Sequence, residues 1–343
     1  MAGRHSPIGI DIGSTSVRAV ETVRGREGPS VIRFGAVPLP LGAVQGGVIQ
    51  DTTAVTAAVR HLWSTAKFRN RKVALGVTNP QIVVRQMSVA NLPTKELRES
   101  LPFQVRDSLP LPVERSLLDF YPLTEGETPE TISGLLIAAP KEAVVTAVEA
   151  VERAGLHVVL VDLASFALLR AASRLDKRVE ALVDIGAQIT SVIVHDDGDP
   201  LIVRTVPRGS AEITEKLASS LKIDIREAEE LKCRTGVVED PEGSARARDV
   251  IREAVRPLVN EIRSSFAYLN TGERQTRVTR LLLSGGGALL PGFLELLAGQ
   301  LNVPTEFADP TLRMRAGRQE SLEGFDEFRL SAAVPIGLTL GAH

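Results

Sequence analysis

Two stretches of the chain place a carboxylate and a glycine at the end of an apolar strand. They are IGIDIGSTSVRAVE, residues 8–21, and ALVDIGAQITSVIV, residues 181–194. In each, an aspartate, Asp11 or Asp184, ends the strand, and a glycine permits a tight turn before a second β-rich run. One copy alone would indicate an ordinary hairpin turn. Two facing copies would surround a phosphate chain and its Mg²⁺ ion with two carboxylates, the metal being held mostly through water.

The composition excludes several classes of protein. The chain has 343 residues, more than one hydrophobic core usually supports, which predicts two domains. Lys plus Arg number 40 against 42 Asp plus Glu, so no overall basic field for nucleic acid is expected. The single cysteine, Cys233, excludes an internal disulfide. No signal core precedes the first strand and no segment approaches the roughly 20 apolar residues of a membrane helix, so we expect a cytoplasmic protein.

Hydrophobic periodicity predicts the same order of elements in both halves of the chain. The first half is predicted to hold strands at 8–12, 17–23 and 30–38, a helix at 53–67 and a strand at 72–78. The second half is predicted to hold strands at 181–186, 190–196 and 200–206, a hairpin turn at Asp197-Gly198, and a helix from about residue 212. Both halves therefore begin with a β-meander followed by a helix.

Residues 83–160 have no counterpart in the second half and are predicted to be an insertion. Their predicted elements are a helix between Pro93 and Pro110, strands near 117–123 and 132–139, and a helix at 141–154. We therefore expect an α/β protein with three parts. These are a first lobe of residues 1–82 and 161–178, an inserted α/β unit of residues 83–160, and a second lobe of residues 179–343.

Three ordered motifs resemble the actin-like ATPase superfamily. GIDIGSTSV is similar to its first phosphate loop, LVDIGAQIT to its second, and LLLSGGGALLPGF to its adenosine loop. Within the superfamily the chain most resembles the PilM family of type IV pilus assembly proteins, which is related to the FtsA division proteins. Ser16 stands where FtsA normally has lysine, and IDIREAEELK at 223–232 looks like the PilM helix that faces the adenosine. The resemblance implies a two-lobed fold of duplicated ribonuclease-H-like meanders with a small α/β insertion in the first lobe.

The candidate site residues follow from the motifs and from the resemblance. The two turns themselves offer N–H groups and hydroxyls to phosphates, from Gly13, Ser14, Thr15, Ser16, Gly186, Ala187, Gln188 and Thr190. The resemblance adds Gly209, Glu229, Lys232, Gly285, Gly286 and Gly287 as contacts of ATP. Glu229 and Lys232 could instead form an i,i+3 surface ion pair, and the glycines could simply be a strand-to-helix turn. Arg208 departs from the paired glycines that relatives often carry before the helix.

Hydrolysis would need a group that orients water toward the γ-phosphate. The superfamily usually draws it from the segment between the lobes, which here offers Asp162. The same side chain could instead cap the helix that begins near Leu163. We therefore expect ATP binding with slow or undetectable turnover.

The resemblance also implies a role and a partner. PilM proteins are adaptors that grip the cytoplasmic N-terminal segment of the bitopic membrane protein PilN and couple it to pilus motor ATPases. The expected peptide site is the groove between the inserted unit and the first lobe. The chain ends before the amphipathic membrane helix of FtsA, so direct membrane insertion is not expected. The alternatives are a filament-forming cytoskeletal ATPase like FtsA or MreB, and a small-molecule kinase of the same superfamily.

Overall fold

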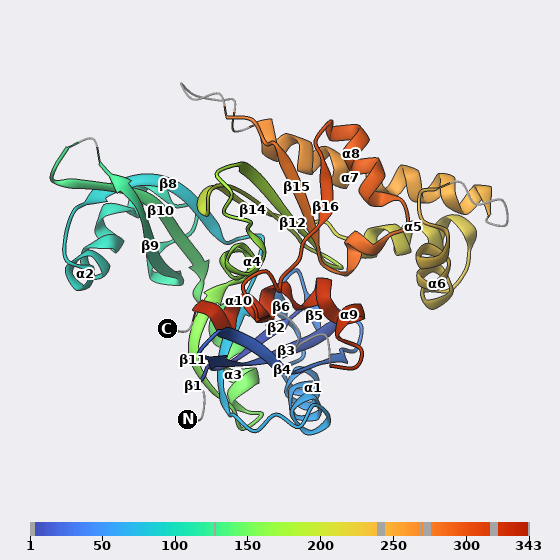
Figure 1. Ribbon diagram of the computed structural model, residues 1–343, viewed down its shortest axis with the longest axis horizontal. Helices are drawn as coiled ribbons and strands as arrows, with labels where there is room; N and C mark the ends of the chain where they lie inside the picture. The colour runs from blue at the N-terminus through green and yellow to red at the C-terminus, as the bar shows by residue number, and fades with distance from the viewer. Residues whose placement is uncertain are drawn as a thin grey trace.

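Two lobes and a lateral sheet make up the computed structural model of the chain (Figure 1). The structure describes residues 4–126, 128–238, 244–267, 269, 276–315 and 322–341. The first lobe and the insertion contain β1 (Arg4–His5), β2 (Ile8–Ile12), β3 (Ser16–Gly25), β4 (Gly28–Pro38), β5 (Val44–Gln45), β6 (Val48–Ile49), α1 (Thr52–Thr65), β7 (Lys72–Val77), β8 (Val83–Ala90), α2 (Thr94–Gln104), β9 (Ser116–Glu125), β10 (Thr131–Pro140), α3 (Lys141–Glu152), β11 (His157–Leu163) and α4 (Ala164–Ala172).

The second half of the chain continues with β12 (Val179–Ile185), β13 (Thr190–Asp196), β14 (Asp199–Val206), α5 (Ala211–Leu221), α6 (Ile225–Thr235), α7 (Ala245–Ala267), β15 (Arg280–Ser284), α8 (Phe293–Leu301), β16 (Thr305–Phe307), α9 (Phe325–Phe328) and α10 (Ala333–Gly341). Short 3₁₀ turns lie at Arg106–Ser108, Val113–Arg115, Gly286–Leu289 and Arg329–Ala332. Among the described residues, no helix combines the length and the apolar character needed to cross a bilayer.

The two lobes share one sheet pattern, as the repeated motif predicts. The first sheet has the order β1-β3-β2-β7-β11, with β4 paired to β3, and the second has the order β14-β13-β12-β15-β16. In each lobe an antiparallel meander begins the sheet and a parallel strand follows, because a helical crossover returns the chain to the same edge. The hairpin turn between β13 and β14 is confirmed, with Asp197 and Gly198 at φ of 49° and 100°.

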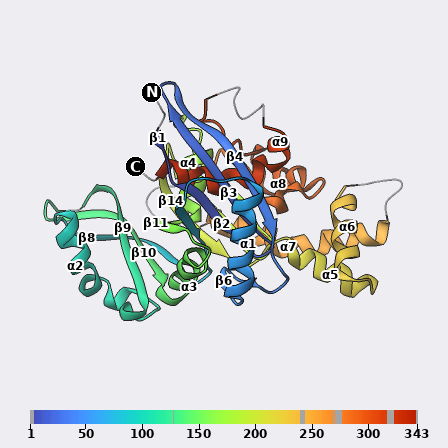
Figure 2. The same cartoon turned by 90° about the horizontal axis from the view of Figure 1, so that it is seen from below.

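A separate antiparallel sheet, β8-β10-β9, forms the inserted unit and lies at the side of the molecule opposite α5 and α6 (Figure 2). The predicted boundary at residue 160 differs from the arrangement of the chain. β11 pairs in parallel with β7 and so extends the first sheet. In α3, Ala150 and Val151 are buried in the same core as Val55 and Leu62 of α1. We therefore propose that the inserted unit is confined to residues 83–140.

The last helix, α10, packs on the first lobe although it follows the second lobe in sequence. A Cβ added at Gly9 of β2 would lie 2.0 Å from the carbonyl oxygen of Pro335, and one at Gly337 would lie 1.7 Å from that of Ala167 in α4. Only glycine permits approaches this close. Val334 and Leu338 of α10 share a core cluster with residues of β7, α4, β12, β13 and β15. α4 and α10 therefore join the two lobes through one apolar layer.

Candidate nucleotide site and adjoining groove

Both Asp-Ile-Gly turns close in the same way. The Gly13 N–H donates to the carbonyl of Ser16 at 3.0 Å, and the Gly186 N–H donates to the carbonyl of Ile189 at 2.9 Å. A Cβ at Gly186 would lie 2.8 Å from the Ile189 oxygen, so this turn requires glycine. The side chains of Ser14 and Thr15 make no hydrogen bond within the described residues. The first turn thus keeps its hydroxyls available for a ligand.

Asp11 is buried at the end of β2, beside an arginine that the sequence motifs did not indicate. Arg18 lies opposite Asp11 in the β2–β3 register, and its Nη1 is 3.4 Å from the carboxylate. Its Nε also donates to the Ser16 hydroxyl at 3.2 Å. Burial raises the pKa of Asp11, and the charge of Arg18 opposes that rise. The hairpin register could have revealed Arg18, since directly opposed residues on one face are close neighbours.

Asp184 occupies the matching position in the second lobe. The pKa of Asp184 is raised to about 6. Burial is the largest cause, the negative charge of Asp11 adds to the rise, and a hydrogen bond from Ser284 opposes it. The two turns face each other across the lobes, as the hydrogen bond between Gln188 and Gly46 and the effect of the Asp11 charge on Asp184 indicate. No three His, Cys, Asp or Glu side chains cluster as a metal site in the described part of the chain. Two carboxylates with few other protein ligands fit Mg²⁺, which keeps much of its water.

The raised pKa predicts that replacing Asp184 by asparagine stabilises the metal-free protein at pH 7. Above pH 6 the folded state carries the unfavourable buried charge, whereas the unfolded chain titrates near 3.8. Each pKa unit corresponds to about 1.4 kcal/mol, and partial exposure reduces the effect, so we expect about 2 kcal/mol of stabilisation. As pH falls through 6 the wild-type carboxylate binds its proton, and the advantage of Asp184→Asn should shrink.

Urea unfolding in EDTA at pH 7 and at pH 5 measures this difference. Asp196→Asn, at the exposed far end of β13, serves as the control and should change stability little. An Asp184→Asn protein that is equally or less stable than wild type at pH 7 would show that Asp184 carries no electrostatic penalty.

The start of α5 is packed onto the second turn. The N–H groups of Ser210 and Ala211 donate to the carbonyls of Gly186 and Ala187 at 3.0 and 2.8 Å. A Cβ at Gly209 would lie 2.4 Å from the Ala187 oxygen, so this glycine is required whether or not a ligand is bound. The contact therefore gives Gly209 a structural role and brings the N-terminus of α5 to the site.

Two other predicted residues of this region, and Arg208 beside them, have partners inside the protein. Thr190 is fully buried and its hydroxyl donates to the carbonyl of Arg208 at 2.9 Å. Arg208 pairs with Glu212 at 2.5 Å. The side-chain oxygen of Gln188 accepts the N–H of Gly46 at 2.8 Å, from the β5–β6 hairpin of the first lobe. In this structure Gln188 thus links the lobes, and Thr190 stabilises the turn.

In the glycine turn after β15, packing requires glycine at two of the three positions and leaves the third free to carry a side chain. Gly285 has a φ of 84°, and a Cβ there would lie 2.5 Å from the Ile185 oxygen. A Cβ at Gly287 would lie 2.5 Å from the Ile185 side chain and 3.1 Å from Cβ of Ser210. Gly286 is exposed, and a Cβ there would meet nothing within 4 Å. This turn lies beside the second phosphate loop and α5, and Gly286 alone is free of packing constraints.

Glu229 and Lys232 form the i,i+3 ion pair, at 2.7 Å, but it is directed into the protein. Lys232 is buried, and its ammonium also donates to the Thr214 hydroxyl at 3.0 Å and to the Ser210 carbonyl at 3.3 Å. The Thr214 hydroxyl is 2.5 Å from the Glu229 carboxylate. The pair therefore ties α6 to α5 beside Gly209, with the Glu229 carboxylate half exposed.

Asp162 lies away from the facing aspartates. Gly76 of β7 pairs with Asp11 of β2 on one side and with Asp162 of β11 on the other. Because β7 lies between the two strands, the backbones of Asp11 and Asp162 are about 10 Å apart. The carboxylate accepts the N–H of Leu163 at 2.8 Å and pairs with Arg170. No side chain caps α4 at its N-cap residue, Leu163, so the expected helix cap is absent there. A catalytic role for Asp162 stays a prediction.

A cavity of about 830 Å³ adjoins Asp162, between the inserted sheet and the first lobe. Tyr121 of β9 and Phe166 of α4 stack across it, with ring centroids 5.6 Å apart. Its lining is mainly apolar, and the β13–β14 hairpin of the second lobe closes one side. Apolar lining residues include Leu117, Phe120, Tyr121, Ile137, Val161, Leu163, Phe166 and Leu175. We call this cavity the groove.

The chain resembles known proteins along nearly its whole length. A model of the family described as type IV pilus assembly protein PilM matches residues 9–343. A solved PilM-PilN type IV pilus biogenesis complex matches with a TM-score of 0.86 and 30% identity, over 98% of this chain and 98% of that chain.

More distant relatives share the actin-like fold. FtsA of Bacillus subtilis is 22% identical over 346 residues, which cover 88% of this chain and 78% of that protein. MreB 5 of Spiroplasma citri, solved with AMPPNP, matches with a TM-score of 0.55 and 15% identity, over 97% of this chain and 94% of that chain. The family match and the repeated lobes lead to one conclusion: the chain belongs to the PilM family of type IV pilus assembly proteins.

Proposed function

We propose that the chain is an ATP-binding adaptor of a type IV pilus or related machinery. It would grip the cytoplasmic N-terminal segment of a PilN-like membrane protein in the groove. The observation that carries the proposal is the match to a solved PilM-PilN complex at 30% identity, together with an apolar groove at the border of the inserted sheet. The adaptor would work in the cytoplasm at the inner membrane face, held there by its partner, and would pass force or signal to pilus motor ATPases.

The two facing turns support Mg²⁺–ATP as the ligand. Asp11 and Asp184 would hold the ion mostly through water. The ion's positive charge would offset the burial of Asp184 and the repulsion from Asp11, which together raise the pKa of Asp184. Turn N–H groups and the hydroxyls of Ser14 and Thr15 would bind phosphate oxygens. Gly286 leaves open space where the resemblance expects adenosine. MreB 5, which shares the fold, was solved with the ATP analogue AMPPNP.

The chemistry of the groove suits an extended peptide with apolar side chains. Val161 of β11 and Leu117 and Tyr121 of β9 are exposed in it, and exposed apolar surface of this kind commonly marks an interaction site. β11 and β9 are both edge strands of their sheets, so each has an unpaired backbone edge that an extended peptide can approach. Asp162 and Arg170 add a charged pair to this lining.

Slow or undetectable ATP turnover fits this assignment. Asp162, the residue expected to position water, pairs with Arg170 in the groove and lies two strands from Asp11. ATP would then act mainly by holding the lobes together, as the Gln188–Gly46 contact already does in part. The protein would use the nucleotide as a conformational ligand.

Loss of both aspartates tests the nucleotide site. The Asp11→Ala, Asp184→Ala double variant should lose Mg²⁺-dependent ATP binding, because both carboxylates that could hold the ion are gone. Isothermal titration with ATP and magnesium measures the affinity, and an Asp249→Ala, Asp326→Ala protein, altered at two exposed positions, serves as the control. Unchanged ATP affinity in the double aspartate variant would refute the site.

A filament-forming ATPase is the second candidate, because FtsA relatives match most of the chain at 22% identity. Sedimentation with ATP distinguishes the adaptor from the filament-forming ATPase. An adaptor should stay in the supernatant, whereas a filament-forming ATPase should pellet in a nucleotide-dependent way. A superfamily kinase would instead transfer phosphate to a small molecule in a phosphotransfer assay.

A further inference from the structure

The segment that joins the two lobes, residues 173–178, is held in an unusual backbone conformation. Leu175 and Lys177 both have a positive φ, 49° and 56°. Non-glycine residues seldom adopt this left-handed region, and two within three residues persist only when their surroundings hold them in place. Contacts with neighbouring residues must therefore hold residues 173–178 in this backbone conformation.

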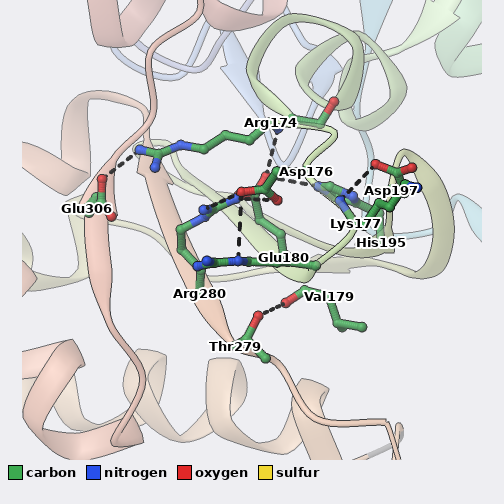
Figure 3. Close-up of polar contacts among 12 residues, drawn as sticks. Arg174, Asp176, Lys177, Val179, Glu180, His195, Asp197, Thr279, Arg280 and Glu306 are labelled. Carbon is green, nitrogen blue, oxygen red and sulfur yellow. Dashed lines mark hydrogen bonds and ion pairs between the residues drawn. The ribbon is translucent and has the colours of Figure 1, made fainter.

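A buried charge network fixes this linker to the second lobe (Figure 3). Arg280 of β15 donates to both oxygens of Asp176 at 2.9 and 3.0 Å and to Glu180 of β12 at 2.6 Å. Glu180 also accepts the backbone N–H of Arg174 at 3.2 Å and lies 3.1 Å from Nε2 of His195. Glu180, His195 and Arg280 are all buried. Opposite charges paired this way in the interior hold the linker firmly.

The same network reaches the turn between β13 and β14. Asp197 accepts the backbone N–H of Lys177 at 3.1 Å, and the N–H of Gly198 donates to Nδ1 of His195 at 3.1 Å. A Cβ at Gly198 would lie 2.7 Å from the Leu175 side chain, so the linker and the turn pack directly together. We call this assembly of linker, buried charges and turn the linker clamp.

The linker clamp lies between the nucleotide site and the groove. β12 and β13 run from the Gly186–Ile189 turn at one end to the Asp197-Gly198 turn at the other, and both strands are almost wholly buried. At that far end, Leu175 and residues 197–199 line the groove. A movement of the phosphate turn can therefore reach the groove wall through one stiff hairpin.

We propose that the linker clamp couples nucleotide binding to the groove by setting the position of this wall. The inference rests on the proposed function, since it concerns how that groove is regulated. When the lobes close on nucleotide, the β12–β13 hairpin and the linker move as one unit, and the groove tightens on its peptide. Without the clamp, the lobes can still close, but the wall no longer follows them.

Asp176→Ala tests the clamp because it removes the bidentate partner of Arg280 without altering the groove lining or the phosphate turns. The matched control is Glu261→Ala, which removes one carboxylate that pairs with an arginine, Arg204, elsewhere in the second lobe. The two side chains are similarly exposed, at 39% and 37%. The probe is a synthetic peptide of the cytoplasmic N-terminus of the PilN-like protein from the same genome, titrated with and without saturating AMPPNP and magnesium.

In wild type and in Glu261→Ala, AMPPNP should tighten peptide binding by about fivefold or more, the usual size of such coupling. In Asp176→Ala, the factor by which AMPPNP tightens peptide binding should fall to less than half its wild-type value. A factor above that threshold, or no tightening in wild type, would overturn the proposal. Peptide that binds none of the proteins would contradict the proposed function instead.

A second measurement tests, without any peptide, whether the linker clamp moves the groove wall when nucleotide binds. Spin labels at Leu117→Cys and Asp199→Cys, in a Cys233→Ser background, report the distance across the groove. AMPPNP should shift this distance in the labelled protein and leave it unchanged when Asp176→Ala is added. A shift of equal size in both would overturn the proposal, as would no shift in either.

Discussion

Replacing Gly286 by phenylalanine is expected to abolish ATP binding while leaving the fold intact. A side chain at Gly286 meets no atom within 4 Å and needs no left-handed backbone, so the folded protein can accept it. The new ring would fill the space where the proposed adenosine lies against bare backbone. We expect affinity to fall about 100-fold or more, equivalent to ~3 kcal/mol.

The matched control is Gly299→Phe, on the exposed surface of α8, where an added Cβ also meets nothing within 4 Å. Both variants should keep the thermal midpoint within a few degrees of wild type, and Gly299→Phe should bind ATP normally. Titration of all three proteins with ATP and magnesium makes the comparison. Normal ATP affinity in Gly286→Phe would place the adenosine elsewhere.

Placing a charge in the groove, with Val161→Asp, is expected to abolish binding of the partner segment. Val161 is 37% exposed on the edge strand β11 and lines the groove. A peptide seated over the new carboxylate would bury it without a partner, which is strongly unfavourable. We expect at least a 100-fold loss of affinity, ~3 kcal/mol, with ATP binding unchanged.

Val159→Asp is a close control, because Val159 is on the same strand, is 45% exposed, and lies outside the groove lining. Fluorescence anisotropy with a labelled peptide of the partner's N-terminus compares the two. Equal loss in both variants would indicate a general effect on β11, and no loss in Val161→Asp would move the peptide site away from the groove.

The two-lobed fold could be predicted from the repeated Asp-Ile-Gly motif together with the repeated element order and the resemblance, because each copy of the motif belongs to a whole supersecondary unit: strand, tight turn and returning strand. The boundary of the insertion could not be predicted in the same way. β11 is continuous in sequence with the inserted segment, and only its parallel pairing with β7 assigns it to the first lobe. α10 likewise returns to the first lobe through contacts at Gly9 and Gly337 that no local pattern encodes.

At the site, Gly209 and the glycine turn after β15 pack beside the second Asp-Ile-Gly turn, whereas Asp162 lies two strands from Asp11. The sequence also could not show how the predicted residues use their polar groups. Gln188 hydrogen-bonds across the lobes and Thr190 bonds to Arg208, because the folded chain brings acceptors and donors near them from distant segments. The resemblance implied a peptide groove between the inserted unit and the first lobe, but not the residues that line it. Those residues could not be named for the same reason, since the two walls come from residues near 120 and near 165. Helical spacing did predict the Glu229–Lys232 pair, which depends on local geometry alone.

Titration of the wild-type chain with the cytoplasmic N-terminal peptide of the PilN-like protein, in ATP and magnesium, tests the proposed adaptor role. We expect one peptide to bind per chain, with an affinity that Val161→Asp abolishes and Val159→Asp leaves unchanged. A wild-type chain that binds ATP but not this peptide, or that binds the peptide equally well with aspartate at position 161, would contradict it.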